Sequence, residues 1–182
     1  LTDVNLVISK QPSATDALWQ RCYTYIDLKQ YDSALADVEK ISELTPKSTT
    51  HHYFKSWVYL YLNKGTEAHQ AAMTHLELNG LKGTSAPYAV ITGYIGLRKA
   101  GKAAAAKAFL NEWLPQLDEK AWTTKVANFF AGKLTGAQLL GEAKSNGELT
   151  ESHAYIGMIQ MLAGTAAPAK VHFDWVIANG TY

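Results

Sequence analysis

Residues Tyr31–Pro46 read YDSALADVEKISELTP and have the pattern of one amphipathic helix that a proline ends. The apolar side of this predicted helix carries Ala34, Leu35, Val38, Ile41 and Leu44, and the charged side carries Asp37, Glu39, Lys40 and Glu43. Pro46 lacks the backbone N–H that a continuing helix needs, and it disfavours helical geometry in the residue before it. The pattern predicts that the apolar side packs between helices and that the charged side, Asp37 included, faces solvent.

Matching residues elsewhere indicate that this helix belongs to a unit that recurs every 34 residues. The pairs at this spacing are Pro12 and Pro46, Cys22 and Ser56, Tyr25 and Tyr59, and Ala34 and Ala68. This is the period of the tetratricopeptide repeat (TPR), and the chain resembles that family of helix-turn-helix arrays. The resemblance implies an all-α fold, an α-solenoid of about eleven helices in antiparallel pairs. No segment shows the period-2 alternation of strands.

We predict a single TPR-like domain over residues 1–182. Residues 1–14 read as the end of a preceding helix pair, and repeats follow at about 15–48, 49–81, 86–117, 118–147 and 151–182. The repeat at 118–147 is degenerate, Arg21 is a misfit in the first repeat, and Gly80 replaces the proline as the helix stop of the second. The small residues expected to let neighbouring helices cross closely are Cys22, Ser56, Gly93 and Gly157.

The second half of the chain also resembles the bacterial NlpI-like TPR lipoproteins. In that family a helix that carries Trp and ends in Phe-x-Gly-Lys precedes a final, well-formed repeat. Trp122, Phe130–Lys133 and Tyr155–Gly157 follow in that order here. The resemblance implies a bacterial protein, with the periplasm or export favoured over the cytoplasm. In that family another helix follows the last repeat, so we expect that the ends of this chain are trimmed.

Composition narrows the classes of function. The 182 residues contain 17 basic and 16 acidic side chains, and this balance predicts no field that would attract nucleic acid. A hydrophobic content of 47% is that of a globular protein. The chain lacks an apolar run of about 18 residues, so no membrane span is predicted. A single cysteine excludes an internal disulfide.

One segment imitates a phosphate-binding loop. Residues Gly96–Ala103 match the G-x-x-x-x-G-K pattern, but Ala103 stands where a metal-ligating Ser or Thr is needed. The segment also follows a predicted helix, whereas a phosphate loop follows a strand. We therefore interpret it as a turn between helices. No catalytic residue or cofactor is predicted, and the chain is not expected to be an enzyme.

The histidines and the cysteine have structural interpretations. None of the six histidines shows the i, i+4 spacing beside a Glu that a helical zinc site needs, so no metal site is predicted. His153 and His172, on opposite helices of the last repeat, are the one pair worth checking. His75 occupies a core position and is expected to be a hydrogen-bonded packing residue. Cys22 is expected to be a buried, inert thiol.

The TPR resemblance implies that the first helix of each pair lines the inner face. The candidate groove residues there are Trp19, Tyr23, Tyr53, Trp57, Tyr61, Tyr94, Arg98, Met158 and Met161. Aromatic and Met side chains on such a face suit an apolar or helical peptide. We predict a non-enzymatic scaffold that binds a protein or peptide. The alternative is that these residues pack against each other or against a second copy, in a self-associating structural or regulatory array of a larger, exported bacterial protein.

Overall fold

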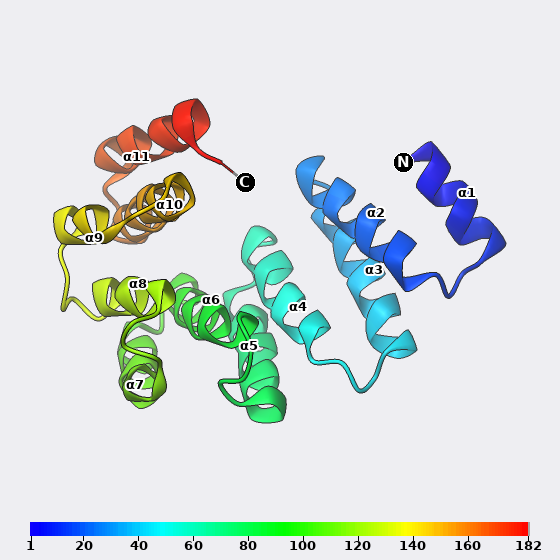
Figure 1. Cartoon of the computed structure of the whole chain (residues 1–182), viewed down its shortest axis with the longest axis horizontal. Helices are drawn as coiled ribbons and strands as arrows, with labels where there is room; N and C mark the ends of the chain where they lie inside the picture. The colour runs from blue at the N-terminus through cyan, green and yellow to red at the C-terminus, as the bar shows by residue number, and fades with distance from the viewer. Residues whose placement is uncertain (182) are drawn as a thin grey trace. The chain divides into compact units, whose positions relative to one another are not determined.

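The computed structural model describes residues 1–181, which form eleven α-helices, one 3-10 turn and no strand (Figure 1). The helices of the first half are α1 (Thr2–Lys10), α2 (Thr15–Asp27), α3 (Tyr31–Leu44), α4 (Thr50–Tyr61), α5 (Gly65–Asn79) and α6 (Ser85–Lys99). Those of the second half are α7 (Ala103–Trp113), η1 (Leu114–Gln116), α8 (Trp122–Phe130), α9 (Gly136–Glu142), α10 (Asn146–Leu162) and α11 (Ala166–Asn179). The all-α prediction, with about eleven helices, is confirmed.

The chain divides into two compact units. Unit 1 comprises Leu1–Ala106, and unit 2 begins at Lys107, so α7 starts in unit 1 and continues into unit 2. In unit 1 each helix from α1 to α5 packs against the helix that follows it in the chain, and α4 also contacts α6. In unit 2, α10 packs against α8, α9 and α11. The helices therefore pack in adjacent pairs, while the single domain over 1–182 stays a prediction.

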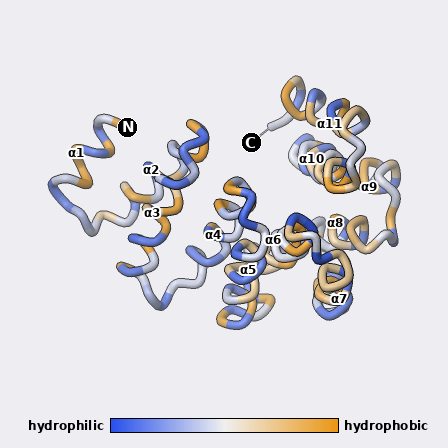
Figure 2. Tube along the Cα trace, turned by 180° about the vertical axis from the view of Figure 1, so that it is seen from behind, coloured by the Kyte–Doolittle hydropathy of each residue, from blue (hydrophilic) through white to orange (hydrophobic). Residues whose placement is uncertain are grey.

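Helix α3 ends at Leu44, just before Pro46, as its sequence predicts. Ala34 and Val38 are fully buried and form a core cluster with Cys22 of α2 and Val58 of α4. Figure 2 shows the matching alternation of orange and blue along the turns of α3. The prediction that Asp37 faces solvent is wrong, because the residue is only 3% exposed. The guanidinium of Arg21 on α2 compensates the buried charge.

Helix α6 is the most buried helix of unit 1, and every residue from Ala89 to Leu97 lies in the interior. A helix that is apolar all round is expected to be enclosed by its neighbours. Its contact with α5 is made possible by Gly65 and Gly96. A Cβ atom added at Gly96 would lie 2.6 Å from the carbonyl oxygen of Gly65, so the two backbones touch directly.

The other small residues predicted at helix crossings have related roles. Cys22 and Ser56 are fully buried, and the Ser56 hydroxyl lies 2.8 Å from that of Thr92 on α6. In unit 2, a Cβ atom at Gly157 of α10 would come within 2.8 Å of the Phe173 ring on α11. Ser56 and Gly157 therefore allow close helix packing, as predicted, whereas Cys22 and Gly93 are shown only to be buried.

The segment that imitates a phosphate loop is a turn. Gly96–Lys99 is the end of α6, and Gly101 has a φ of +74° before α7 begins at Ala103. Glycine suits this position, because residues with a side chain rarely adopt positive φ.

Within residues 1–181, no helix combines the length and apolarity needed to cross a bilayer.

Candidate functional site

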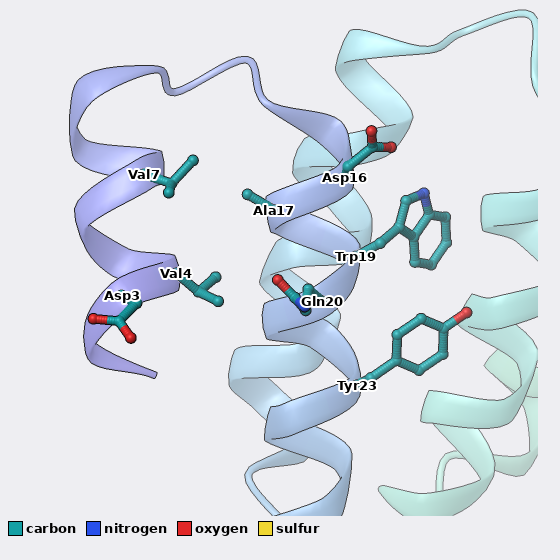
Figure 3. A pocket seen from close by; sticks show the side chains of 8 residues that line it. All are labelled: Asp3, Val4, Val7, Asp16, Ala17, Trp19, Gln20 and Tyr23. Atoms are coloured by element: carbon teal, nitrogen blue, oxygen red, sulfur yellow. The ribbon is translucent and has the colours of Figure 1, made fainter.

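A groove of about 510 Å³ lies along α1 and α2 in unit 1. We call it the α1–α2 groove; its lining consists of Asp3, Val4, Val7, Asp16, Ala17, Trp19, Gln20 and Tyr23. Figure 3 shows Val4 and Val7 pointing from α1 toward α2, while Trp19 and Tyr23 project from the other side of α2. The lining thus reaches from the apolar side of α1 across α2 to two of the predicted groove residues.

The position of α1 beside this groove is fixed by a polar contact. The Arg21 Nη1 of α2 donates a hydrogen bond of 2.9 Å to the Asn5 Oδ1 of α1. Three large apolar residues are nevertheless strongly exposed here: Leu1, which precedes α1, and Leu6 and Val7 of α1, at 43%, 54% and 48%. Val7 lines the groove, whereas Leu6 does not. Helix α1 therefore presents an apolar surface that the described residues leave accessible.

The aromatic residues at the groove are held in place by ring contacts. The Trp19 ring lies 4.6 Å from the Phe54 ring of α4, and the Tyr23 ring lies 5.4 Å from Phe54 in an edge-on arrangement. Trp19 and Phe54 also pack on the core cluster. Tyr23 remains 48% exposed, and burial raises the pKa of its phenol. Tyr23 is thus a neutral, half-exposed side chain on a rigid support.

A second aromatic group lies on α3 and α4. The Tyr61 ring stacks on Tyr31 at 5.1 Å with an interplanar angle of 15°, and on Trp57 at 6.4 Å. Tyr61 is 45% exposed, whereas Trp57 and Tyr31 are half-buried. Burial raises the pKa of Tyr61 as well. Like Tyr23, Tyr61 therefore combines exposure with fixed orientation.

The remaining candidate residues occupy different environments. Tyr53 is half-buried against Phe54 and His75, and Tyr94 is only 4% exposed, with its hydroxyl accepting a hydrogen bond of 2.7 Å from Arg98. The Tyr94 ring therefore belongs to the interior, and Arg98 is the half-buried member of that pair. Met158 and Met161 lie on α10 in unit 2, where Met161 is 51% exposed.

Residues with potential chemical reactivity are mostly structural. Cys22 is fully buried, and burial raises the pKa of its thiol to about 12, so it is protonated and inert at neutral pH. The Nδ1 of the buried His75 donates a hydrogen bond of 2.9 Å to the Thr49 carbonyl, and its Nε2 lies 3.2 Å from the Ser85 hydroxyl. Both predictions are confirmed. Among residues 1–181, no group of three or more His, Cys, Asp or Glu side chains could hold a metal ion.

Sequence reasoning missed three residues that contribute to this surface or support it. Asp3 and Asp16 were not recognised because isolated acidic residues in the first turn of a helix are common and stabilise its dipole. Phe54, which supports both Trp19 and Tyr23, lies in none of the positions assigned to the groove. Its contacts join α2 to α4 and follow from the packing of those helices.

Comparisons with known proteins identify the fold. No family model matches the chain, and no curated protein matches it. Among solved structures, it is similar to a tetratricopeptide repeat protein from Parabacteroides merdae ATCC 43184, with a TM-score of 0.66 and 16% sequence identity. The match covers 98% of this chain and 70% of that chain. The protein therefore has the fold of a tetratricopeptide repeat protein.

Proposed function

We propose that unit 1 is a non-enzymatic module that binds a helical segment of a partner protein, with an apolar face and flanking Lys or Arg residues. The observation that carries this proposal is the composition of the α1–α2 groove. Val4, Val7 and Ala17 provide an apolar surface, and the charged residues in the lining, Asp3 and Asp16, are both acidic.

The apolar part of the groove suits a partner helix. Such a helix presents large apolar side chains every three or four residues, and burying one of them contributes about 1.5–3 kcal/mol. Val7 and Tyr23 each have about half of their surface available for burial, at 48% exposure. Because Tyr23 is already held against Phe54, it loses little conformational entropy when a partner binds.

The charges of the groove favour a basic partner. Asp3 and Asp16 lie in the first turns of α1 and α2, and both are exposed. Exposed acidic side chains beside an apolar contact attract Lys and Arg, repel acidic segments and accelerate association. The net charge of the whole chain, +1, gives no such preference, so the preference is local to the groove.

The second aromatic group extends the proposed surface within unit 1. Trp57 and Tyr61 lie on α4, the helix whose Phe54 supports Trp19 and Tyr23. Aromatic side chains of this kind often dominate the free energy of protein–protein binding. Tyr53 and Arg98 remain proposed contributors at its margin, and Met158 and Met161 remain a separate proposal in unit 2.

A pair of synthetic peptides tests the function. Both carry Leu on one face of a 14-residue helix; one carries Lys on the other face and the second carries Glu, and binding is measured by fluorescence anisotropy of a label on the peptide. We expect the Lys peptide to bind and the Glu peptide to bind at least about tenfold more weakly. Equal affinity for both, or no binding of either, would contradict the proposal.

Two substitutions on one helix locate the site. Val7 and Leu6 are neighbours on α1 with similar exposure, but only Val7 lines the groove. We expect Val7→Lys to weaken binding of the Lys peptide by about tenfold or more, and Leu6→Lys to change it less than about threefold. The reason is that only the positive charge introduced at position 7 enters the groove, where it repels the Lys side chains of the peptide. Light scattering on the same samples tests the alternative of self-association: a stable dimer that ignores both peptides would favour it.

A further inference from the structure

Two histidines in unit 2 contact each other through their Nδ1 atoms. His153 lies on α10 and His172 on α11, and their Nδ1 atoms are 3.0 Å apart. The two helices form a tightly packed pair, with Gly157 of α10 against the Phe173 ring of α11. Both histidines are half-buried, so solvent can reach them. This is the pair that the sequence singled out, and the fold brings it into contact.

The contact requires that at least one of the two rings be neutral. In a hydrogen bond between two Nδ1 atoms, one ring donates its N–H and the other accepts with a lone pair. If both rings were protonated, two N–H groups and two positive charges would face each other. Burial lowers the pKa of both histidines, and that of His153 is lowered further by the neighbouring His172. Two neutral imidazoles satisfy the observed contact, and the neutral imidazole is the form that binds metals.

We propose that His153 and His172 form a two-histidine site for a divalent transition metal, in which both Nδ1 atoms bind one ion and the proton of the donor ring moves from Nδ1 to Nε2. A metal–imidazole bond is about 2.0–2.1 Å long, so two nitrogens bound to one ion at 90–110° lie roughly 2.9–3.4 Å apart. The observed separation of 3.0 Å falls within that range. Metal binding therefore needs the two rings to rotate toward a common point, but it does not need the helices to separate.

The orientation of His153 is set in advance by an aromatic contact. Its ring lies flat on the indole of Trp175, with centroids 4.0 Å apart and an interplanar angle of 6°. Trp175 is three residues from His172 on α11, so one helix supplies both the second ligand and the support for the first. A ligand held in this way loses less entropy on metal binding than a mobile side chain.

The proposed metal site leaves several coordination positions of the ion free for water. With two protein nitrogens, the remaining coordination positions of the ion are filled by water, which agrees with the absence of a group of three ligands among residues 1–181. Imidazole ligands suit Cu²⁺, Ni²⁺ and Zn²⁺, and affinities for such a site are expected to be highest for Cu²⁺. The proposed groove belongs to unit 1, so this inference does not depend on it.

Titration of the full chain with Cu²⁺ tests the site. Bound Cu²⁺ is expected to quench the fluorescence of Trp175 with a stoichiometry of one ion per chain, and its electron paramagnetic resonance spectrum should show coupling to two nitrogens. His153→Gln and His172→Gln should each weaken binding at least about tenfold, since either change removes one of two ligands. Far-UV circular dichroism verifies that each variant keeps its helices.

A second histidine pair provides the matched control. The rings of His51 and His52 on α4 lie 4.2 Å apart, but no hydrogen bond joins them among the described contacts. We expect His52→Gln to leave Cu²⁺ affinity unchanged. Equal binding by wild type, His153→Gln and His172→Gln would overturn the proposal, as would the absence of stoichiometric binding in the wild type. Loss in one variant alone would also overturn it, because the site requires both ligands.

Discussion

Arg21 of α2 donates two hydrogen bonds to the carboxylate of Asp37 on α3, from Nε at 2.9 Å and from Nη2 at 2.6 Å. The Asp37 side chain is 4% exposed and that of Arg21 is 21% exposed, so the pair lies at the edge of the core. The third nitrogen of the same guanidinium binds Asn5 of α1. One side chain therefore ties together the three helices that form and support the proposed groove.

The first prediction concerns the stability of unit 1. Arg21→Met should lower the free energy of unfolding by about 2–3 kcal/mol, because it leaves the buried Asp37 carboxylate without its positive partner. Adding Asp37→Leu to that variant should restore part of the loss. The control is Lys40→Met, which breaks an exposed ion pair with Glu43 and should change the free energy of unfolding far less. Urea denaturation measures all four proteins; a smaller effect for Arg21 than for Lys40 would contradict the prediction.

The second prediction concerns the contact between α5 and α6. Gly96→Ala should destabilise the protein by about 1–3 kcal/mol, because the new Cβ atom would meet the Gly65 carbonyl oxygen and the two backbones would have to separate. Gly141→Ala on α9 is the matched control, since a Cβ atom there has no neighbour within 4 Å among the described residues. Alanine favours a helix over glycine by up to about 1 kcal/mol, so that variant should be as stable as the wild type or more stable in thermal unfolding.

The third prediction distinguishes the effect of an acidic charge in the groove on peptide binding from its effect on the helix dipole. Asp16 and Asp32 are both exposed residues in the first turn of a helix, so Asn at either position removes the same interaction with the helix dipole. Only Asp16 lines the groove. Asp16→Asn should weaken binding of the Lys peptide by about three- to tenfold and reduce its salt dependence, whereas Asp32→Asn should change neither. An equal effect of the two substitutions would show that the attraction is not local.

The fourth prediction concerns acid stability. His51 is 2% exposed, and burial, followed by the charges of His52 and Lys55, lowers its pKa to about 4. The unfolded chain, with the ordinary pKa of about 6.5, binds a proton that the folded chain does not. The stability contributed by neutral His51 is therefore present above pH 6.5 and is lost as the pH falls toward 4. The free energy of unfolding should fall by up to about 1.4 kcal/mol per pH unit from this residue.

Replacing His51 separates its contribution to the loss of stability at low pH from that of the other histidines. The pKa values of His52, His69, His153 and His172 are also lowered by burial, so their titration acts in the same direction. Denaturant unfolding at several pH values should give a shallower pH dependence for His51→Gln than for the wild type between pH 6.5 and 4. Identical slopes would mean that His51 titrates at its ordinary pKa in the folded chain.

Much of the fold follows from local sequence signals. The alternation along Tyr31–Leu44, the stop before Pro46 and the 34-residue spacing predict helices that the structure contains. These signals are readable because helix periodicity and proline geometry act within a few residues. The small residues Cys22, Ser56 and Gly157 could be predicted from the sequence as well, since a repeat places small residues at equivalent points.

The candidate surface depended more strongly on tertiary structure. Tyr94 occupies the same kind of position as Tyr61, yet it is 4% exposed whereas Tyr61 is 45% exposed. The difference arises because α6 is buried along its whole central part, Ala89–Leu97, and no pattern within α6 states which neighbours bury it. The acidic lining of the groove likewise requires α1 and α2 to lie side by side.

The sequence by itself therefore determined that this protein is a helical repeat array, with its helices, turns and small crossing residues at particular positions. Only the tertiary structure decided that Arg21 pairs with a buried Asp37, that Gly65 meets Gly96, and that His153 meets His172. The physical reason is the range of the interactions. Helix formation is a property of neighbouring residues, whereas burial, charge pairing and ligand convergence depend on which helix faces lie against each other after packing.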